Sequence, residues 1–254
     1  MRRSRTGLLV LVASIVALIG ACGRDGTANR ADSRGSRPTA HLGTEQPAPA
    51  ASASSTAPAT PTSAGEDGRP QIVVLGDSLS AGLGLLENQA YPALLQQKLD
   101  ADGYKLHVVN AGVSGDTSAA GLDRMDWALQ GDVRILILEL GANDGLRGLP
   151  VNEMKKNLSE IIRKAQQKGI SVLLLGMEAP PNYGPEYAVS FRRVFPDLAR
   201  EFHVTLVPFM LDGVAGNAAL NQGDGIHPNV EGAQIVAETI WKILQPMVDA
   251  VSAS

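Results

Sequence analysis

Four short polar segments of the 254-residue chain contain residue types that could carry out acyl transfer. Ser78 follows an apolar run, and a serine hydroxyl is a useful nucleophile at neutral pH only when a neighbouring base accepts its proton. His227, in a loop bounded by Gly225 and Pro228, is the candidate base, and Asp224 lies three residues before it. A carboxylate at that spacing can bind one imidazole nitrogen and stabilise the imidazolium formed during attack. The spacing therefore predicts a Ser78, His227, Asp224 catalytic triad.

Each of these residues also has a structural interpretation. A serine directly after a strand is commonly the N-cap of a helix, and Asp224 could cap a helix that begins near Pro228. The chain has four histidines. His41 lies in a low-complexity segment, His107 in a predicted strand and His203 at a helix-to-strand junction, so His227 is the best-placed base.

Apolar runs alternate with amphipathic stretches in the part of the chain that carries these residues. Some of the runs are continuously apolar, as in strands buried on both faces. The predicted strands are 71–75, 105–110, 134–140, 170–176 and 204–209, and the predicted helices are 92–100, 151–168, 186–202 and 230–246. Alternating strands and helices predict a three-layer α/β/α sandwich with a mainly parallel five-stranded sheet. Ligands bind beyond the carboxyl ends of such strands, where all four polar segments fall.

The polar segments also carry a family resemblance. The supporting stretches are GDSLSAG (76–82), VVNAGVSGDTSAAGLDR (108–124), ELGANDGLRG (139–148), PNYG (181–184) and DGIHPN (224–229). In this order they resemble GDSL-type esterases of the SGNH hydrolase superfamily, most closely the bacterial arylesterase and multifunctional thioesterase I, protease I and lysophospholipase group. The resemblance covers residues 70–250 and implies a flavodoxin-like SGNH hydrolase fold.

The resemblance implies further site residues. It assigns the oxyanion hole to the backbone N–H groups of Ser78 and Gly115 and to the side-chain amide of Asn143, although Asn143 could equally be a turn residue. We expect Asp77 and Asp144 to support these loops.

The implied reaction is hydrolysis of acyl esters through an acyl-enzyme intermediate, with aryl esters, acyl thioesters and lysophospholipids as substrates. A hypothesis for the acyl groove is that apolar side chains line it and that glycines let its loop move. The candidate lining residues are Leu79, Leu146, Leu149 and Pro180.

Two other functions remain open on the same fold. One is an O-acetyl esterase acting on cell-envelope polysaccharide, and the other is a noncatalytic envelope binding protein.

Other kinds of ligand are disfavoured. Nucleotide binding is disfavoured because Gly82-Leu83-Gly84 lacks the third glycine of a dinucleotide fingerprint. One cysteine and one well-placed histidine are too few for a metal site, so we expect no metal and no cofactor. A net charge of −4 without clustered Lys and Arg beyond the first residues disfavours nucleic acid. The sequence predicts no oligomeric state.

The N-terminal residues predict export. Arg2, Arg3 and Arg5 precede an apolar run, 8–19, that is too short to span a membrane comfortably and ends at Ala21-Cys22, like a bacterial lipobox. We interpret 1–21 as a lipoprotein signal peptide, 22–69 as a lipidated Cys22 with a disordered Ala/Pro/Ser/Thr-rich tether, and 70–254 as the hydrolase domain. Ordinary signal cleavage with an incidental cysteine is the alternative. The predicted location is the cell envelope, anchored to a membrane by lipid. In a Gram-negative host, Gly23 would favour the outer membrane, facing the periplasm.

Overall fold

The structure, a computed structural model, describes residues 68–253. The predicted signal peptide, Cys22 and all but the last two residues of the predicted tether lie outside the described residues.

A five-stranded, all-parallel sheet forms the middle of the fold, with strand order β2-β1-β3-β4-β5. The strands are β1 (Gln71–Gly76), β2 (His107–Gly112), β3 (Val133–Glu139), β4 (Ser171–Leu175) and β5 (Thr205–Val207). All five predicted strands are present, and the predicted parallel sheet is confirmed. β2 lies two residues later than predicted, and β5 is shorter because pairing with β4 ends at Val207, before Pro208.

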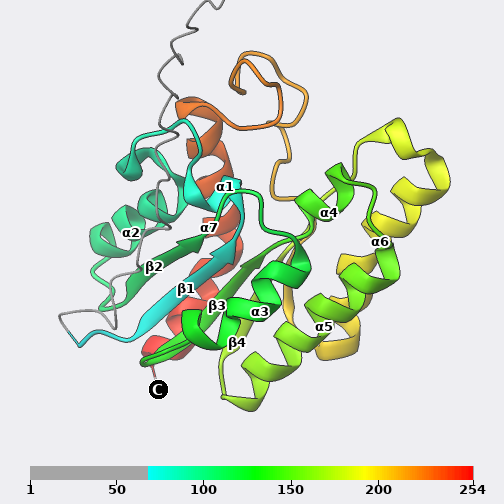
Figure 1. The fold of residues 1–254 in the computed structure, drawn as a ribbon. Coiled ribbons are helices and arrows are strands. Elements are labelled where there is room, and N and C mark those ends of the chain that lie inside the picture. The colour runs from blue at the N-terminus through cyan, green and yellow to red at the C-terminus, as the bar shows by residue number, and fades with distance from the viewer. Residues whose placement is uncertain (1–67, 254) are drawn as a thin grey trace, which may run out of the picture. The chain divides into compact units, whose positions relative to one another are not determined.

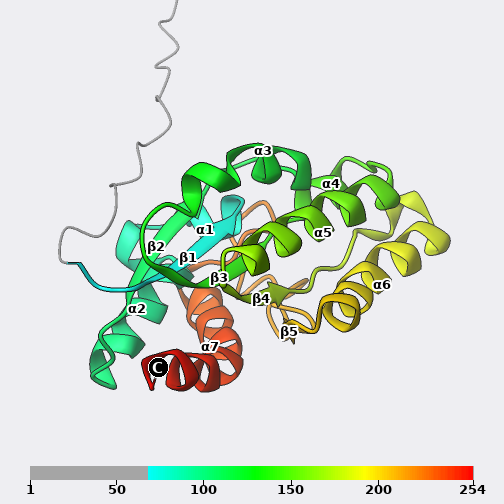
Figure 2. The same cartoon turned by 90° about the horizontal axis from the view of Figure 1, so that it is seen from below.

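Helices cover both faces of the sheet and make the predicted three-layer sandwich (Figure 2). The longer helices are α2 (Tyr91–Ala101), α3 (Ser118–Ala128), α5 (Val151–Gln167), α6 (Pro185–Phe202) and α7 (Val230–Ser252). α3 and α5 pack together on one face, and α2 and α7 pack together on the other. α6 packs along α5 and the β4–β5 side of the sheet.

Short helices occupy the edge to which the strands point (Figure 1). They are α1 (Ser78–Ala81) after β1 and α4 (Ala142–Leu146) after β3, with two 3-10 turns, η1 (Glu87–Gln89) and η2 (Pro181–Tyr183). The long loop that follows β5 and leads into α7, orange in Figure 1, lies at the same end. All the polar segments found in the sequence therefore meet at one edge.

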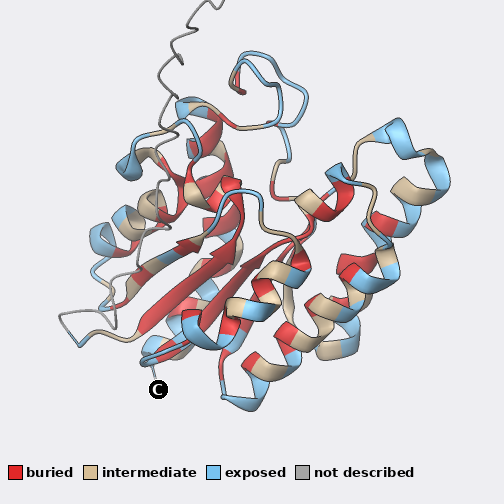
Figure 3. Cartoon of the chain, in the orientation of Figure 1, coloured by how far each residue is buried: buried red, intermediate tan, exposed pale blue. Residues whose placement is uncertain are grey.

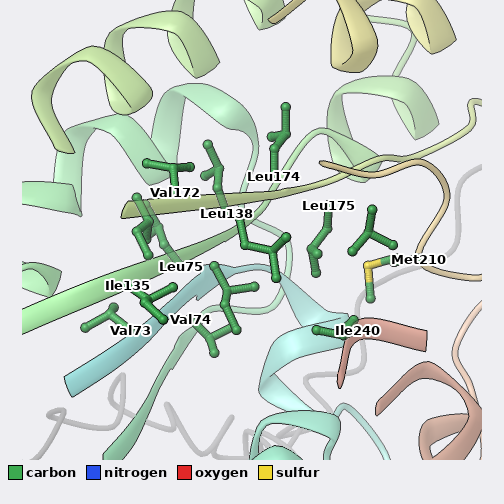
Figure 4. Packing of buried hydrophobic residues seen from close by; sticks show 14 of the residues in the cluster. Val73, Val74, Leu75, Ile135, Leu138, Val172, Leu174, Leu175, Met210 and Ile240 are labelled. Carbon is green, nitrogen blue, oxygen red and sulfur yellow. The ribbon is translucent and has the colours of Figure 1, made fainter. Parts of the chain in front are cut away.

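The central strands are buried on both faces, as their uninterrupted apolar sequences predict. All six residues of β1 are buried, and so are the last five of β3 (Figure 3). Figure 4 shows Val73 and Leu75 of β1 packed beside Ile135 and Leu138 of β3, with Ile240 of α7 at the right of the view. This rigid centre fixes the strand ends from which the polar segments project.

Two of the longer helices differ from the sequence-based expectation. α3 was not predicted, because its buried side is made of the small residues Ser118, Gly121 and Ala128 with only one long apolar residue, Met125. α7 continues through Pro246 to Ser252. Proline ordinarily disrupts a helix interior, but Leu244 and Val248 on either side of Pro246 are fully buried and hold both halves against the core.

Candidate active site

Ser78 is the first residue of α1, directly beyond the carboxyl end of β1. The helix cap is Asp77 rather than Ser78, because Oδ1 of Asp77 accepts a 3.0 Å hydrogen bond from the Leu79 N–H. The cap interpretation of Ser78 is therefore wrong, and its hydroxyl is free for another partner. Ser78 is only 8% exposed, so little of its surface is open to solvent.

Two glycines let the chain turn sharply around Ser78. A Cβ on Gly76 would lie 2.1 Å from Oγ of Ser80, and a Cβ on Gly112 would lie 2.4 Å from the backbone nitrogen of Ala81. Neither distance is compatible with a side chain, so glycine allows α1 to sit directly against the ends of β1 and β2.

Ser78, His227 and Asp224 form one continuous chain of hydrogen bonds. Oγ of Ser78 lies 2.8 Å from Nε2 of His227, and Nδ1 of His227 lies 2.6 Å from Oδ2 of Asp224. An ionised carboxylate can only accept, so we assign the ring proton to Nδ1. Nε2 is then left with the lone pair that a general base needs.

Asp224 is held by the backbone of its own loop. Its Oδ1 accepts hydrogen bonds of 3.0 Å from the N–H groups of both Ile226 and His227. The His227 backbone and side chain together lower the pKa of the Asp224 carboxyl to about 2, so it is charged at neutral pH. The cap of α7 is Asn229, whose side chain accepts from the Gly232 N–H, and the capping alternative for Asp224 is wrong.

Gln222 fastens the His227 loop to the segment after α1. Its Nε2 donates to the carbonyl oxygens of Leu83 at 2.7 Å and Pro228 at 3.0 Å. Its backbone N–H donates to the carbonyl oxygen of His227 at 2.7 Å. These bonds place the imidazole of His227 over Ser78 although the two residues are 149 positions apart.

Asn143 lies in α4, the short helix that follows β3 at the same edge of the sheet as Ser78. Its Nδ2 donates a 3.0 Å hydrogen bond to Oδ2 of Asp77. One N–H of the amide is thereby fixed, and the other has no acceptor within residues 68–253. Asn143 lines the same cleft as Ser78 and His227.

Gly115 lies in the loop between β2 and α3 with φ of +88°, a conformation that favours glycine. Its carbonyl oxygen accepts a 2.7 Å hydrogen bond from Arg147. This bond joins the Gly115 loop to the segment that follows Asn143.

The two other acidic residues expected to support the loops make such contacts. Asp77 caps α1 and orients Asn143, as described above. Asp144 accepts from the backbone N–H of Ser118 at 2.8 Å and from its hydroxyl at 2.7 Å, which joins α4 to the start of α3.

Glu139, the last residue of β3, was not among the residues singled out from the sequence. It is fully buried, and its Oε2 accepts from the Asp77 N–H at 3.1 Å and from the Ser80 hydroxyl at 2.8 Å. It thus holds the residues on both sides of Ser78. Burial and the nearby Asp77 carboxylate raise the pKa of Glu139 well above its usual value. A carboxyl residue at the buried end of an apolar strand was the signal that could have identified it.

A cleft of about 470 Å³ opens beside Ser78 and His227. Its walls include the apolar side chains Leu79, Leu146, Met177, Pro180, Phe209 and Ile226. Three of the four predicted groove residues line it, whereas Leu149 lies outside the lining, where its carbonyl oxygen instead accepts from the Tyr187 hydroxyl. A second, much smaller cavity of about 10 Å³ is also lined by Ser78 and His227, together with Leu83 and Met210.

Between residues 68 and 253, no group of three or more His, Cys, Asp or Glu side chains is arranged to hold a metal ion. Over the same residues, every helix is too short or too polar to cross a bilayer.

Known proteins are similar to this chain in both sequence and fold. Residues 74–235 match the model of the GDSL-like lipase/acylhydrolase family. The chain is 44% identical to "Esterase TesA" of Pseudomonas aeruginosa, over 70% of this chain and 89% of that protein. It is 40% identical to "Thioesterase 1/protease 1/lysophospholipase L1" of Escherichia coli K12, over 70% of this chain and 85% of that protein.

A solved structure extends the likeness to the fold. The psychrotrophic esterase EstA from Pseudoalteromonas sp., in a structure inhibited by monoethylphosphonate, is 35% identical and superposes with a TM-score of 0.67. The match covers 70% of this chain and 98% of EstA. The family model covers more than half of the chain, and both relatives are matched over most of their length. This chain therefore belongs to the GDSL-like lipase/acylhydrolase family and is an enzyme that hydrolyses ester bonds.

Proposed function

We propose that the protein is a serine esterase and thioesterase that works through a Ser78, His227, Asp224 triad and an acyl-enzyme intermediate. The observation that carries the proposal is the unbroken hydrogen-bond chain from Ser78 through His227 to Asp224, with Asn143 beside it. A decayed or purely binding site would have no need to keep a charged carboxylate, an oriented imidazole and a hydroxyl in contact.

The reaction follows from these contacts. Oγ of Ser78 attacks the carbonyl carbon while its proton passes to Nε2 of His227, and the carbonyl electron pair moves onto oxygen. The intermediate then collapses: the bond to the leaving oxygen or sulfur breaks, and the leaving group takes the proton from Nε2. Water repeats both steps on the acyl-Ser78 ester and releases the acid. Asp224 keeps the ring oriented and stabilises the transient imidazolium.

Three N–H donors are proposed for the negative oxygen of the intermediate. They are the backbone N–H groups of Ser78 and Gly115 and the second N–H of the Asn143 amide. Asn143 is a suitable donor because an amide NH₂ is neutral and does not compete with His227 for the proton. Each such donor contributes about 3 kcal/mol to lowering the barrier.

The cleft supports a proposal for the substrate class. Its volume of about 470 Å³ and its largely apolar walls beside Ser78 suit an acyl chain. Because similar proteins bear the names esterase, thioesterase and lysophospholipase, we propose acyl esters, acyl thioesters and lysophospholipids as substrates. A scan of p-nitrophenyl esters of increasing chain length tests this, and a strict preference for acetyl would instead favour the polysaccharide O-acetyl esterase.

A fluorophosphonate probe tests the nucleophile. Attack by Ser78 forms an Oγ–P bond and expels fluoride, so intact protein should gain one adduct by mass and lose activity in step. Ser78→Ala should take no adduct, while Ser159→Ala, a serine of α5 remote from the cleft, should label at the rate of the unaltered protein. Absence of label on the unaltered protein, or full labelling of Ser78→Ala, contradicts the proposal.

We also propose that Cys22 is lipidated after removal of residues 1–21, so that the enzyme works at a membrane surface in the cell envelope. The support is the basic and apolar N-terminal sequence ending at Cys22. Acyl chains contribute about 0.8 kcal/mol per buried methylene, so several chains suffice for stable anchoring. Cells fed an alkyne-tagged palmitate should label the full chain but not Cys22→Ala. An unlabelled full chain would favour ordinary signal cleavage.

A further inference from the structure

Arg124 of α3 makes three hydrogen bonds that join separate parts of the active-site edge. Its Nε donates to Oδ2 of Asp116 at 2.6 Å, and its two terminal nitrogens donate to the carbonyl oxygens of Ala111 at 2.6 Å and Gly76 at 2.9 Å. Its side chain is 17% exposed and that of Asp116 is 13% exposed, so the ion pair is largely shielded from water. One side chain therefore binds the ends of β1 and β2 and the loop beyond β2.

The atoms that Arg124 binds are close in sequence to two of the proposed oxyanion donors. Gly76 precedes Ser78 by two residues, and Asp116 directly follows Gly115. The Gly76 carbonyl oxygen also accepts from the Val113 N–H at 3.0 Å, so both of its lone pairs have partners. The turn before Ser78 and the loop that carries Gly115 are thus fixed to the same guanidinium group.

Only arginine suits this arrangement. The guanidinium is planar and rigid, with donors that point in fixed directions, so three acceptors on three segments hold one another in place. A lysine ammonium ends in a single nitrogen on a flexible chain and cannot span the three acceptors. Asp116 completes the arrangement by supplying the compensating charge, which a mostly buried cation needs.

Building on the proposed function, we propose that Arg124 is a positioning residue for the oxyanion hole. It keeps the N–H groups of Ser78 and Gly115 directed at the position of the negatively charged oxygen of the intermediate. Arg124 does not line the cleft and touches no reacting atom. Its loss should therefore weaken stabilisation of the transition state and leave the binding of substrate nearly unchanged.

The test compares Arg124→Lys with Arg134→Lys. Arg134, near the start of β3 and so far from the catalytic edge, makes a two-pronged, exposed contact with Asp132 and serves as the matched control. Active sites are counted by fluorophosphonate titration, and kcat per titrated site and KM are measured with a short p-nitrophenyl ester. For Arg124→Lys we expect kcat to fall by about 10- to 100-fold and KM to change by less than about 3-fold. Arg134→Lys should match the unaltered protein.

Three results would separate the interpretations. If Arg124→Lys keeps its full kcat per titrated site while its melting temperature falls, the role is only structural and the inference is wrong. If the unaltered protein takes no fluorophosphonate, the proposed function itself fails. If Arg124→Lys does not fold, Asp116→Asn applies the same criterion. It removes the charge but keeps a carbonyl acceptor, and a smaller loss confined to kcat supports the role, whereas an unchanged kcat contradicts it.

Discussion

The Asn143 amide and the Asp77 carboxylate are joined by a 3.0 Å hydrogen bond from Nδ2 to Oδ2, across 66 positions of the chain. Asp77 is fully buried and also caps α1 through its other oxygen. One carboxylate therefore fixes both the helix that begins with Ser78 and the orientation of the Asn143 amide.

This relationship predicts a large effect for Asp77→Asn. An asparagine at 77 that still caps α1 would direct its NH₂ group at the NH₂ group of Asn143. Asn143 would turn over and direct an oxygen, rather than an N–H, at the oxyanion. We expect kcat to fall by roughly 10²- to 10³-fold, as when an oxyanion donor is removed.

Steady-state kinetics with a double-mutant cycle check this prediction. Asn143→Ala should lose about as much as Asp77→Asn, and the double variant should lose little more, because both changes remove the same donor. Asp126→Asn, an exposed position on α3, is the control and should keep its kcat. Additive losses would show that Asp77 acts independently of Asn143.

The pH dependence of kcat/KM should show one ionisation on the acid side. His227 must be neutral to accept the Ser78 proton, so activity falls as the imidazole is protonated. Because hydrogen bonds lower the pKa of Asp224 to about 2, its carboxylate stays charged well below the pH at which histidines titrate. A plot of log kcat/KM against pH should therefore have a limiting slope of about 1. A slope of about 2 would show that a second group titrates as well, such as Asp77, whose pKa is raised by burial. A requirement for added divalent metal would contradict this mechanism.

Stability should depend on pH through Glu139. Its folded-state pKa is raised well above the usual 4.5, so the unfolded chain releases this proton at a lower pH than the folded protein. Rising pH therefore favours the unfolded state between the two pKa values. Glu139→Gln cannot ionise, while its carbonyl oxygen can still accept from Asp77 and Ser80. Urea unfolding at about pH 5 and about pH 8 should show the variant gaining stability relative to the unaltered protein as pH rises. Parallel profiles would show that Glu139 is ionised in the folded state.

Chain-length preference should respond to Leu146 and not to Leu149. Leu146 lines the cleft, whereas Leu149, three residues later, does not. Leu146→Ala should lower kcat/KM for an octanoyl ester by roughly 3- to 10-fold, since removing part of an apolar contact costs about 1 kcal/mol, and should leave acetyl ester hydrolysis nearly unchanged. Leu149→Ala is the matched control. Equal effects of the two substitutions would place the acyl chain elsewhere.

The sequence predicted those parts of the fold that depend on long apolar runs. β1 and β3 are buried on both faces and are apolar almost throughout, and the spacing of Met154, Leu158 and Ile161 predicted α5. α3 was missed because its contacts with the core use small residues, which leave little periodic signal.

The residues of the candidate site also fall into those that the sequence predicted and those that it did not. Ser78, Asp224 and His227 were predictable because their residue types are suited to acyl transfer and all three were expected at the same edge of the sheet. The partners Glu139 and Arg124 were not, since their importance comes from contacts across 59 and 48 positions, to Ser80 and Gly76. Leu149 was misplaced because spacing alone does not show which side of a loop a side chain occupies.

The distance between Ser78 and His227 along the chain has a consequence for biosynthesis. A ribosome has made Ser78, the proposed nucleophile, long before it reaches position 227 of 254. The loop that carries His227, the proposed base, is bonded through Gln222 to Leu83, in the segment that follows Ser78. Under the proposed mechanism, a chain that ends before position 227 therefore contains the nucleophile without its base and cannot cleave esters.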